Sequence, residues 1–361
     1  MANMGKLRLL CLTFGAALAF AAARAAAAEG PPAPQPELLL EPMKIGEKVE
    51  LPPPRVRPVF SPNGRFVAFV EIAAGKQLVV IADVAQRAIV ASAVVSNDVV
   101  AGWPSWSPDS RWVGFATEGS RVAYLSIDGI RNDWRVSFYG ALRGLIWQPI
   151  SGTRFIVLSE RAVWSIGVSG ARTPRKLVLG KPGEHPTSIS LTADGRKLVY
   201  CSGGRVWLTT RPTSPGNIIA APEKPVAQLT RAWVAPDGSC VVAAGPDAAD
   251  RERERAMLFG VAEGSAALLE VAGRITSVAW APNSRAFALA ANGKIFVFSA
   301  SGKLLGKLVD DEATDRDPCW DPDGGRIVFS SVRRDADRNG KIDAKDPADI
   351  YLIDVPPALR G

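Results

Sequence analysis

Six residues near the end of the chain have the types and the spacing to bind a metal ion. The stretch DADRNGKIDAKD carries carboxylates at its positions 1, 3, 9 and 12, an amide oxygen at position 5 and a glycine at position 6. Ca²⁺ takes about seven oxygen ligands, and the glycine permits the sharp turn that gathers them. The predicted ligands are Asp335, Asp337, Asn339, the backbone carbonyl of Lys341, Asp343 and Asp346.

This spacing is that of an EF-hand loop, but the chain around it is not helical in pattern. The strand-like run Tyr351–Asp354 follows the loop, where an EF-hand has its second helix. Asp346 at position 12, in place of glutamate, makes the loop resemble the dockerin type. We expect a structural ion rather than a catalytic one, because the loop itself saturates the coordination. The alternative is an acidic hairpin tip that binds nothing.

The elements that position this loop belong to a sequence repeat. Seven copies share a pattern of a strand end, a Pro-Asp-Gly-like turn and an apolar run. They begin at Phe60, Trp106, Trp147, Leu191, Val234, Trp280 and Trp320. The spacing between copies is about 43 residues, with only β-type runs inside each unit, and this period is typical of a propeller.

The repeated turn and the strand after it have clear physical roles. Proline fixes the φ angle of the first turn position, and the Asp or Asn side chain forms a hydrogen bond with the nearby backbone. Glycine takes the position that needs φ > 0. The following run, such as Phe66–Val70, is apolar at consecutive positions, which a strand covered on both faces requires. We expect the tryptophans that begin four of the copies to fill the wedges between neighbouring sheets.

These patterns predict an all-β fold, a single β-propeller of about seven four-stranded blades over residues 43–355, with six blades as the fallback. The seventh unit has no room for a fourth strand before the tail, residues 356–361. A propeller closes when the other chain end supplies that strand, which also removes an exposed edge. Met43–Leu51 is the predicted closing strand.

The Ser-Pro-Asp-Gly repeat followed by an apolar strand resembles the WD40-like (PD40-type) repeat of the TolB-like propeller family. The resemblance covers roughly residues 55–355 and implies the propeller architecture. It says little about function. TolB itself carries an α/β domain before its propeller, whereas only about thirty residues separate the leader from the first unit here.

The calcium loop fits this repeat as an insertion. The second-to-third strand hairpin of the seventh unit is longer than that of the second unit by the length of one loop, because Phe329 to Asp354 spans 25 residues and Phe115 to Asp128 spans 13. The loop is therefore predicted at the tip of that hairpin, where two strands hold its ends.

The first residues indicate export. Lys6 and Arg8 precede a short apolar run and a stretch of small residues, which is typical of a signal peptide, here residues 1–28. A Pro-rich spacer, residues 29–42, follows. We expect a periplasmic or extracellular monomer with no transmembrane segment after the leader is removed. A net charge of +7, part of it in the leader, does not favour a nucleic-acid partner.

The residues available for catalysis are few. His185 is the only histidine, and the serine motif of hydrolases that carry similar propellers does not occur. We therefore predict no catalytic residue and no cofactor other than Ca²⁺. The alternative is a propeller enzyme, lyase- or lactonase-like, acting on a glycan or small molecule. Cys201, Cys240 and Cys319 are predicted to be buried, unpaired thiols.

Function is expected on one face of the ring. The hairpins between the second and third strands of the blades and the links between blades emerge on the same face of the ring. Loops on a rigid scaffold commonly carry binding residues. The unusual segments there are the calcium loop, Ala248–Arg255, Asp310–Asp317 and Gly180–Pro186. The predicted function is an exported binding scaffold whose partner is a protein, glycan or small ligand on this face. A structural role in a larger assembly is a further alternative.

Overall fold

A computed structural model describes residues 34–40, 44–45, 48–49, 53–95, 99–135, 140–169, 173–179, 184–210, 216–335, 339–343 and 346–361. The chain divides into two compact units, Met1–Gln35 and Pro36–Gly361, and all the strands described below belong to the second. The signal peptide predicted at residues 1–28 lies outside the described residues. No helix in the described part is long and apolar enough to cross a membrane.

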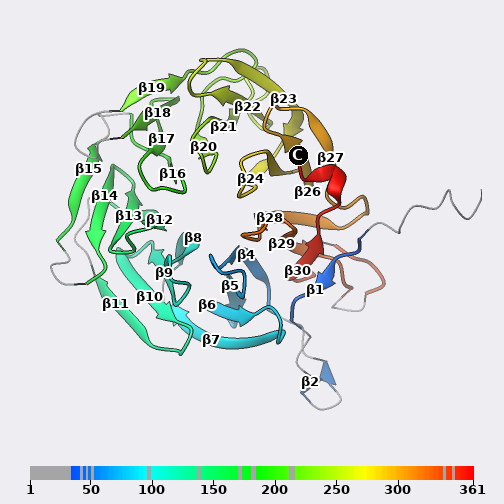
Figure 1. Cartoon of the computed structure of the whole chain (residues 1–361). Helices are drawn as coiled ribbons and strands as arrows, with labels where there is room; N and C mark the ends of the chain where they lie inside the picture. Colours follow the sequence, from blue (N-terminus) through cyan, green and yellow to red (C-terminus); the bar gives the residue numbers. More distant parts are fainter. Residues whose placement is uncertain are drawn as a thin grey trace, which may run out of the picture. The chain divides into compact units, whose positions relative to one another are not determined.

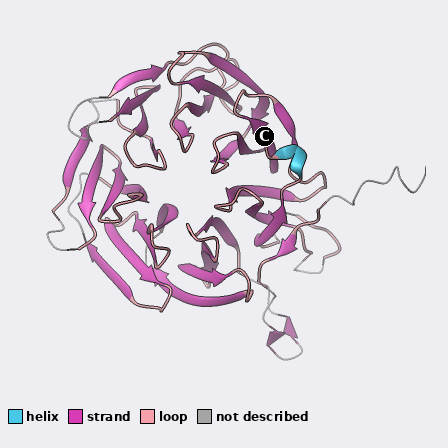
Figure 2. Ribbon diagram, viewed as in Figure 1, coloured by secondary structure: helices cyan, strands magenta, loops and turns pink. Residues whose placement is uncertain are grey.

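The second unit is a β-propeller, as predicted. Its described residues form seven four-stranded antiparallel sheets arranged in a ring (Figures 1 and 2). Blade 1 contains β4 (Arg55–Phe60), β5 (Phe66–Ala73), β6 (Lys76–Asp83) and β7 (Ala88–Val95). Blade 2 contains β8 (Val100–Trp106), β9 (Trp112–Thr117), β10 (Arg121–Ser126) and β11 (Arg131–Arg135). Blade 3 contains β12 (Leu142–Trp147), β13 (Arg154–Ser159), β14 (Ala162–Gly167) and β15 (Arg175–Leu179).

The remaining blades repeat this order. Blade 4 contains β16 (Ser188–Leu191), β17 (Leu198–Ser202), β18 (Arg205–Thr209) and β19 (Asn217–Ala220). Blade 5 contains β20 (Arg231–Val234), β21 (Cys240–Pro246), β22 (Glu254–Gly260) and β23 (Ala266–Gly273). Blade 6 contains β24 (Ile275–Trp280), β25 (Ala286–Ala291), β26 (Lys294–Ser299) and β27 (Leu304–Lys307). Blade 7 contains β28 (Thr314–Trp320), β29 (Arg326–Val332), β30 (Asp349–Asp354) and β1 (Glu37–Leu38), and a short 3₁₀ helix, η1 (Pro357–Leu359), follows it.

Each repeated turn lies between the first and second strands of its blade and is held by its own side chains. In blade 1 the Ser61 hydroxyl donates to Asn63 Oδ1 at 2.7 Å and accepts the Phe66 N–H at 3.0 Å. Asn63 Oδ1 also accepts the Arg65 N–H at 3.0 Å. Such local bonds satisfy the backbone where the chain reverses, which is why Ser, Asn and Asp recur there.

The core lies between blades. The described residues form seven clusters of buried apolar side chains, each contributed by two neighbouring blades. The second strand of every blade is buried along most of its length, as its unbroken apolar sequence predicted. Trp106, Trp147 and Trp320 are buried in these seams, and Trp280 is half-buried.

The N-terminal segment closes the ring, but the predicted strand was wrong. β1 pairs antiparallel with β30 through Glu37 and Leu38, and the Leu39 N–H donates to the Ile350 carbonyl at 2.9 Å. Within Met43–Leu51, β2 (Lys44–Ile45) and β3 (Lys48–Val49) pair only with each other. The reason is burial: Leu39 and Leu40 are 2% and 4% exposed in the seam between blades 7 and 1, whereas Met43–Leu51 alternates with charged residues.

Replacing Leu39 by alanine should therefore weaken closure. We expect the free energy of unfolding to fall by about 2 kcal/mol, near the low end for buried leucines because a short edge strand can relax. Val94→Ala, at a side chain 42% exposed, should change stability by less than about 0.5 kcal/mol. Equal effects in chemical denaturation would contradict the assignment of Leu39 to the closing seam.

Candidate functional site on the loop face

The antiparallel blades give the ring two distinct faces. We call the face with the second-to-third hairpins and the links between blades the loop face, and the one with the repeated turns the turn face. The predicted calcium loop lies on the loop face between β29 and β30, and Ala248–Arg253 lies between β21 and β22. Asp310–Ala313 links β27 to β28. Of Gly180–Pro186, only residues 184–186 are described.

The described part of the calcium loop is folded around its own acceptors. Asp335 accepts the Asn339 N–H at 3.0 Å and the Gly340 N–H at 2.7 Å, while Asn339 Oδ1 accepts the Lys341 N–H at 2.9 Å. Gly340 adopts φ +83°, the left-handed conformation that a glycine at position 6 supplies.

The second half of the loop has its own bonds. Asp346 is 4% exposed, and its Oδ2 accepts the Asp343 N–H at 2.9 Å. Among the described residues, no group of three or more His, Cys, Asp or Glu side chains is gathered to hold a metal ion. Asp337, the predicted ligand at position 3, lies outside those residues. The oxygen donors and the turn at Gly340 suit a hard cation. Calcium binding itself stays a prediction.

A chain of ion pairs, buried at Arg55 and Asp349, joins the base of this loop to blade 1. Arg334 Nη2 lies 2.5 Å from Asp349 Oδ2, and Asp349 Oδ1 lies 3.0 Å from Arg55 Nη1. Arg55 in turn places its Nε 2.9 Å from Glu71 Oε2. The Arg55 N–H also donates to the Ala348 carbonyl at 2.8 Å. The hairpin that carries the loop is thus bonded to the first strand of blade 1 across the closing seam.

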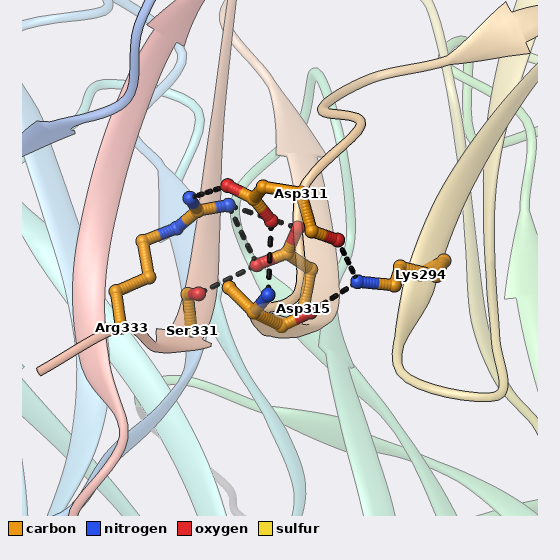
Figure 3. A network of polar contacts seen from close by, with 6 residues as sticks. Lys294, Asp311, Asp315, Ser331 and Arg333 are labelled. Carbon is orange, nitrogen blue, oxygen red and sulfur yellow. Dashed lines mark hydrogen bonds and ion pairs between the residues drawn. The ribbon is translucent and has the colours of Figure 1, made fainter. Parts of the chain in front are cut away.

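The acidic link between blades 6 and 7 is not the free acidic surface that its sequence indicates. In Figure 3 the Arg333 guanidinium lies between the Asp311 and Asp315 carboxylates. Its Nη2 is 3.0 Å from both Asp315 oxygens, and the Ser331 hydroxyl donates to Asp315 Oδ1 at 2.5 Å. Lys294 Nζ donates to the Asp311 carbonyl.

Burial changes the pKa of two acids, Asp315 and Asp317. It raises the pKa of Asp315 above its usual value, although the Ser331 hydroxyl and Arg333 act in the opposite direction. It likewise raises the pKa of Asp317, whose Oδ2 accepts the Arg57 N–H at 3.2 Å. The Asp315 carboxylate is bonded within blade 7, and the Asp317 carboxylate bonds blade 7 to the first strand of blade 1. Neither is displayed to a partner.

The segment Ala248–Arg255 contributes to an open groove at blades 5 and 6. Arg231 Nη2 lies 2.5 Å from Glu254 Oε1 and forms the inner wall. The hairpin tip at Arg251 and the link at Arg274 complete a groove of about 470 Å³. Both of these arginines are exposed, and neither guanidinium forms an ion pair within the described part of the chain. The groove thus presents two exposed guanidinium groups to solvent, together with the exposed carboxylate of Glu252.

The other predictions are resolved in part. His185 is half-buried in its link, and its Nδ1 has no hydrogen-bond partner among the described residues. Cys201 is a buried free thiol, as predicted, and burial raises its pKa to about 12. Cys240 and Cys319 are also unpaired, but they are only half-buried, which corrects the prediction that all three are buried.

The sequence reasoning missed the arginines that organise this face. Arg55 and Asp349 are 294 residues apart, and Arg333 meets Asp315 because β29 pairs antiparallel with β28, which places Asp315 opposite Ser331. One signal was present: Arg333 and Arg334 directly precede the acidic loop, so a pairing with nearby acids could have been expected.

Comparison with known proteins supports the fold. No protein-family model matches the chain, and no curated protein sequence matches it. Among solved structures, it is similar to the β-propeller domain of Cps50 (Swd1) from Myceliophteria thermophila. The TM-score is 0.64 and the identity 15%, over 89% of this chain and all of that domain. Together with the seven sheets, this likeness confirms the seven-bladed β-propeller and shows the fold alone.

Proposed function

We propose that this protein is an exported, TolB-like propeller that acts as a binding scaffold, with its partner on the loop face. The observation that carries the proposal is the groove at blades 5 and 6, where the exposed Arg251 and Arg274 form no ion pair with any described residue. Arginine is favoured where carboxylates are recognised, because its planar guanidinium binds both oxygens. The partner is therefore a protein that presents carboxylates.

The calcium loop belongs to this proposal as a structural element. Ca²⁺ would be held by the oxygen donors of residues 335–346, and it would stiffen the hairpin whose base is bonded to Arg55. A bound cation there would also neutralise acids that repel one another. The signal-like N-terminus supports a calcium-rich, extracytoplasmic location.

Charge reversal in the groove tests the scaffold function. Arg251→Glu with Arg274→Glu should reduce capture of carboxylate-bearing partner proteins from the extracytoplasmic fraction at least about tenfold, because attraction becomes repulsion. The matched control is Arg196→Glu with Arg285→Glu, two exposed arginines on the turn face. Quantitative pull-down measures the effect. Equal capture by both double variants would remove the groove from the proposal.

A further inference from the structure

The seam between blades 2 and 3 differs on the turn face from the three other seams that carry a wedge tryptophan. Three wedge tryptophans donate their indole N–H to a carbonyl of the preceding blade at 2.9–3.0 Å: Trp106 to Val59, Trp280 to Trp233 and Trp320 to Ala279. Trp147 instead donates to the Gly152 carbonyl of its own turn at 2.8 Å. The indole that would tie blade 3 to blade 2 is therefore turned toward its own blade.

The turns at this seam are also not bonded to each other. Between blades 1 and 2, the Asn63 N–H donates to Ser110 Oγ at 3.0 Å, and Asp237 and Ser284 form the same bond between blades 5 and 6 at 3.1 Å. Gly152 occupies the corresponding place in blade 3, since it adopts φ +60° and its N–H donates to the Gln148 carbonyl, as the N–H groups of Ser110 and Ser284 donate within their own turns. A glycine has no hydroxyl with which to accept such a bond from blade 2.

A cavity of about 390 Å³ opens at this seam. Trp112, Tyr124 and Trp147 line it, and Asp109 and Ile150 stand at its rim. This volume lies within the range of small-molecule sites, which combine aromatic walls with a few polar groups. Ile150 is 73% exposed and adopts φ +66°, a conformation that a branched side chain rarely takes. Strain of this kind is concentrated at binding sites.

The cavity has rigid aromatic walls. The Tyr124 ring packs edge-on against the Trp112 ring, with centroids 5.1 Å apart and planes at 88°. It also packs against the Trp147 ring, with centroids 6.1 Å apart and planes at 60°. These contacts hold the rings in place, so a ligand loses little of its binding free energy to ordering them.

The rim adds polar chemistry. Asp109 Oδ1 accepts the Ser107 hydroxyl at 2.5 Å and the Arg111 N–H at 3.1 Å, while Oδ2 makes no bond within the described residues. A purely apolar ligand would desolvate this carboxylate, and an anion would be repelled by it. A ring with an apolar C–H face and hydroxyl groups along its edge satisfies both the aromatic walls and the rim.

We propose that the cleft between blades 2 and 3 is a binding site for pyranose rings of a neutral glycan. The aromatic side chains stack against the C–H face of the sugar, and Asp109 accepts hydrogen bonds from its hydroxyl groups. This site lies on the turn face, opposite the groove at blades 5 and 6, and it does not depend on the partner proposed there.

The test titrates the full chain with maltotriose, cellotriose and chitotriose, followed by tryptophan fluorescence and calorimetry. We expect at least one of them to bind with a Kd of about 1 mM or tighter. Trp112→Ala should weaken that binding at least about tenfold, a loss of about 1.4 kcal/mol, because it removes one of the aromatic walls of the cavity. Trp207→Ala, at a half-buried tryptophan in blade 4, is the matched control and should leave binding unchanged.

A second variant separates binding from folding. Ile150→Gly removes a cavity-lining side chain and also relieves its positive φ, so binding should weaken while the melting temperature stays within about 2 °C of the wild type. The proposal is overturned if none of the three sugars binds below about 10 mM. It is also overturned if binding survives in both variants, or if tetramethylammonium binds more tightly than every sugar. Capture of a partner by the loop face stays intact in these variants, so failure here leaves the scaffold proposal standing.

Discussion

Replacing Arg55 by alanine is expected to lower the free energy of unfolding by about 3–5 kcal/mol. Arg55 is 8% exposed and is the central cation of the closing seam, paired with both Glu71 and Asp349. Its removal leaves the half-buried Glu71 without that partner and leaves Asp349, which is buried, with Arg334 as its remaining ion-pair partner. Breaking one side of a buried pair is much more damaging than losing a surface pair, because the remaining charge has no water to solvate it.

Arg65 provides the matched control. Its Nε lies 2.9 Å from Asp83 Oδ2, the same distance as in the Arg55–Glu71 pair, but the Arg65 side chain is 60% exposed. Arg65→Ala should lower the free energy of unfolding by less than about 1 kcal/mol. Denaturation by guanidinium chloride, followed by intrinsic fluorescence, compares the two variants. Similar midpoints for Arg55→Ala and Arg65→Ala would show that the buried network does not hold the ring closed.

Chelation of calcium is expected to produce the second largest change. A ligand present at 100 times its Kd stabilises the folded state by about 2.7 kcal/mol, so exchanging millimolar Ca²⁺ for EGTA should lower the melting temperature by several degrees. The fall in melting temperature should be large for a change in a surface loop, because the base of this loop is bonded through Arg334 and Asp349 to the closing seam. Calorimetric scans in both buffers measure it.

Two variants make this result specific. Asp335→Asn keeps an oxygen that accepts a backbone N–H but removes the charge of the carboxylate. It should therefore abolish the difference in melting temperature between Ca²⁺ and EGTA. Asp323→Asn, at an exposed aspartate on the turn face of the same blade, should leave the difference intact. Equal melting temperatures for the wild type in Ca²⁺ and in EGTA would remove the metal from the proposed function.

The sequence determined the elements of this fold because their signals are local. A proline, an Asp or Asn and a glycine within four residues specify a chain reversal whatever surrounds it. The apolar run after each turn specifies a strand covered on both faces, and β5 and β25 are buried as such runs require. Seven such units at one period determine a ring, since each wedge can bury its faces only against a neighbour.

Only the tertiary structure decided how the ring is closed and which charges are available. Glu37–Leu38, not the more strand-like segment after it, pairs with β30, because the three adjacent leucines supply the apolar side chains that the last seam lacks. The acidic link reads as a free surface in the sequence, yet Arg333 neutralises two of its carboxylates. Such pairings join residues whose separation along the chain carries no information about their separation in space.

The two candidate sites also differ in how much of each could be predicted from the sequence. The spacing of residues 335–346 predicts a set of calcium ligands from sequence alone, because all its donors lie in one loop. The cleft between blades 2 and 3 depends on the direction in which a single indole N–H points. The sequence shows that Trp147 begins a turn with Ile150 in place of Asp or Asn, but it does not show where the indole points. A side-chain orientation is set by contacts between blades, and those contacts exist only once the ring has formed.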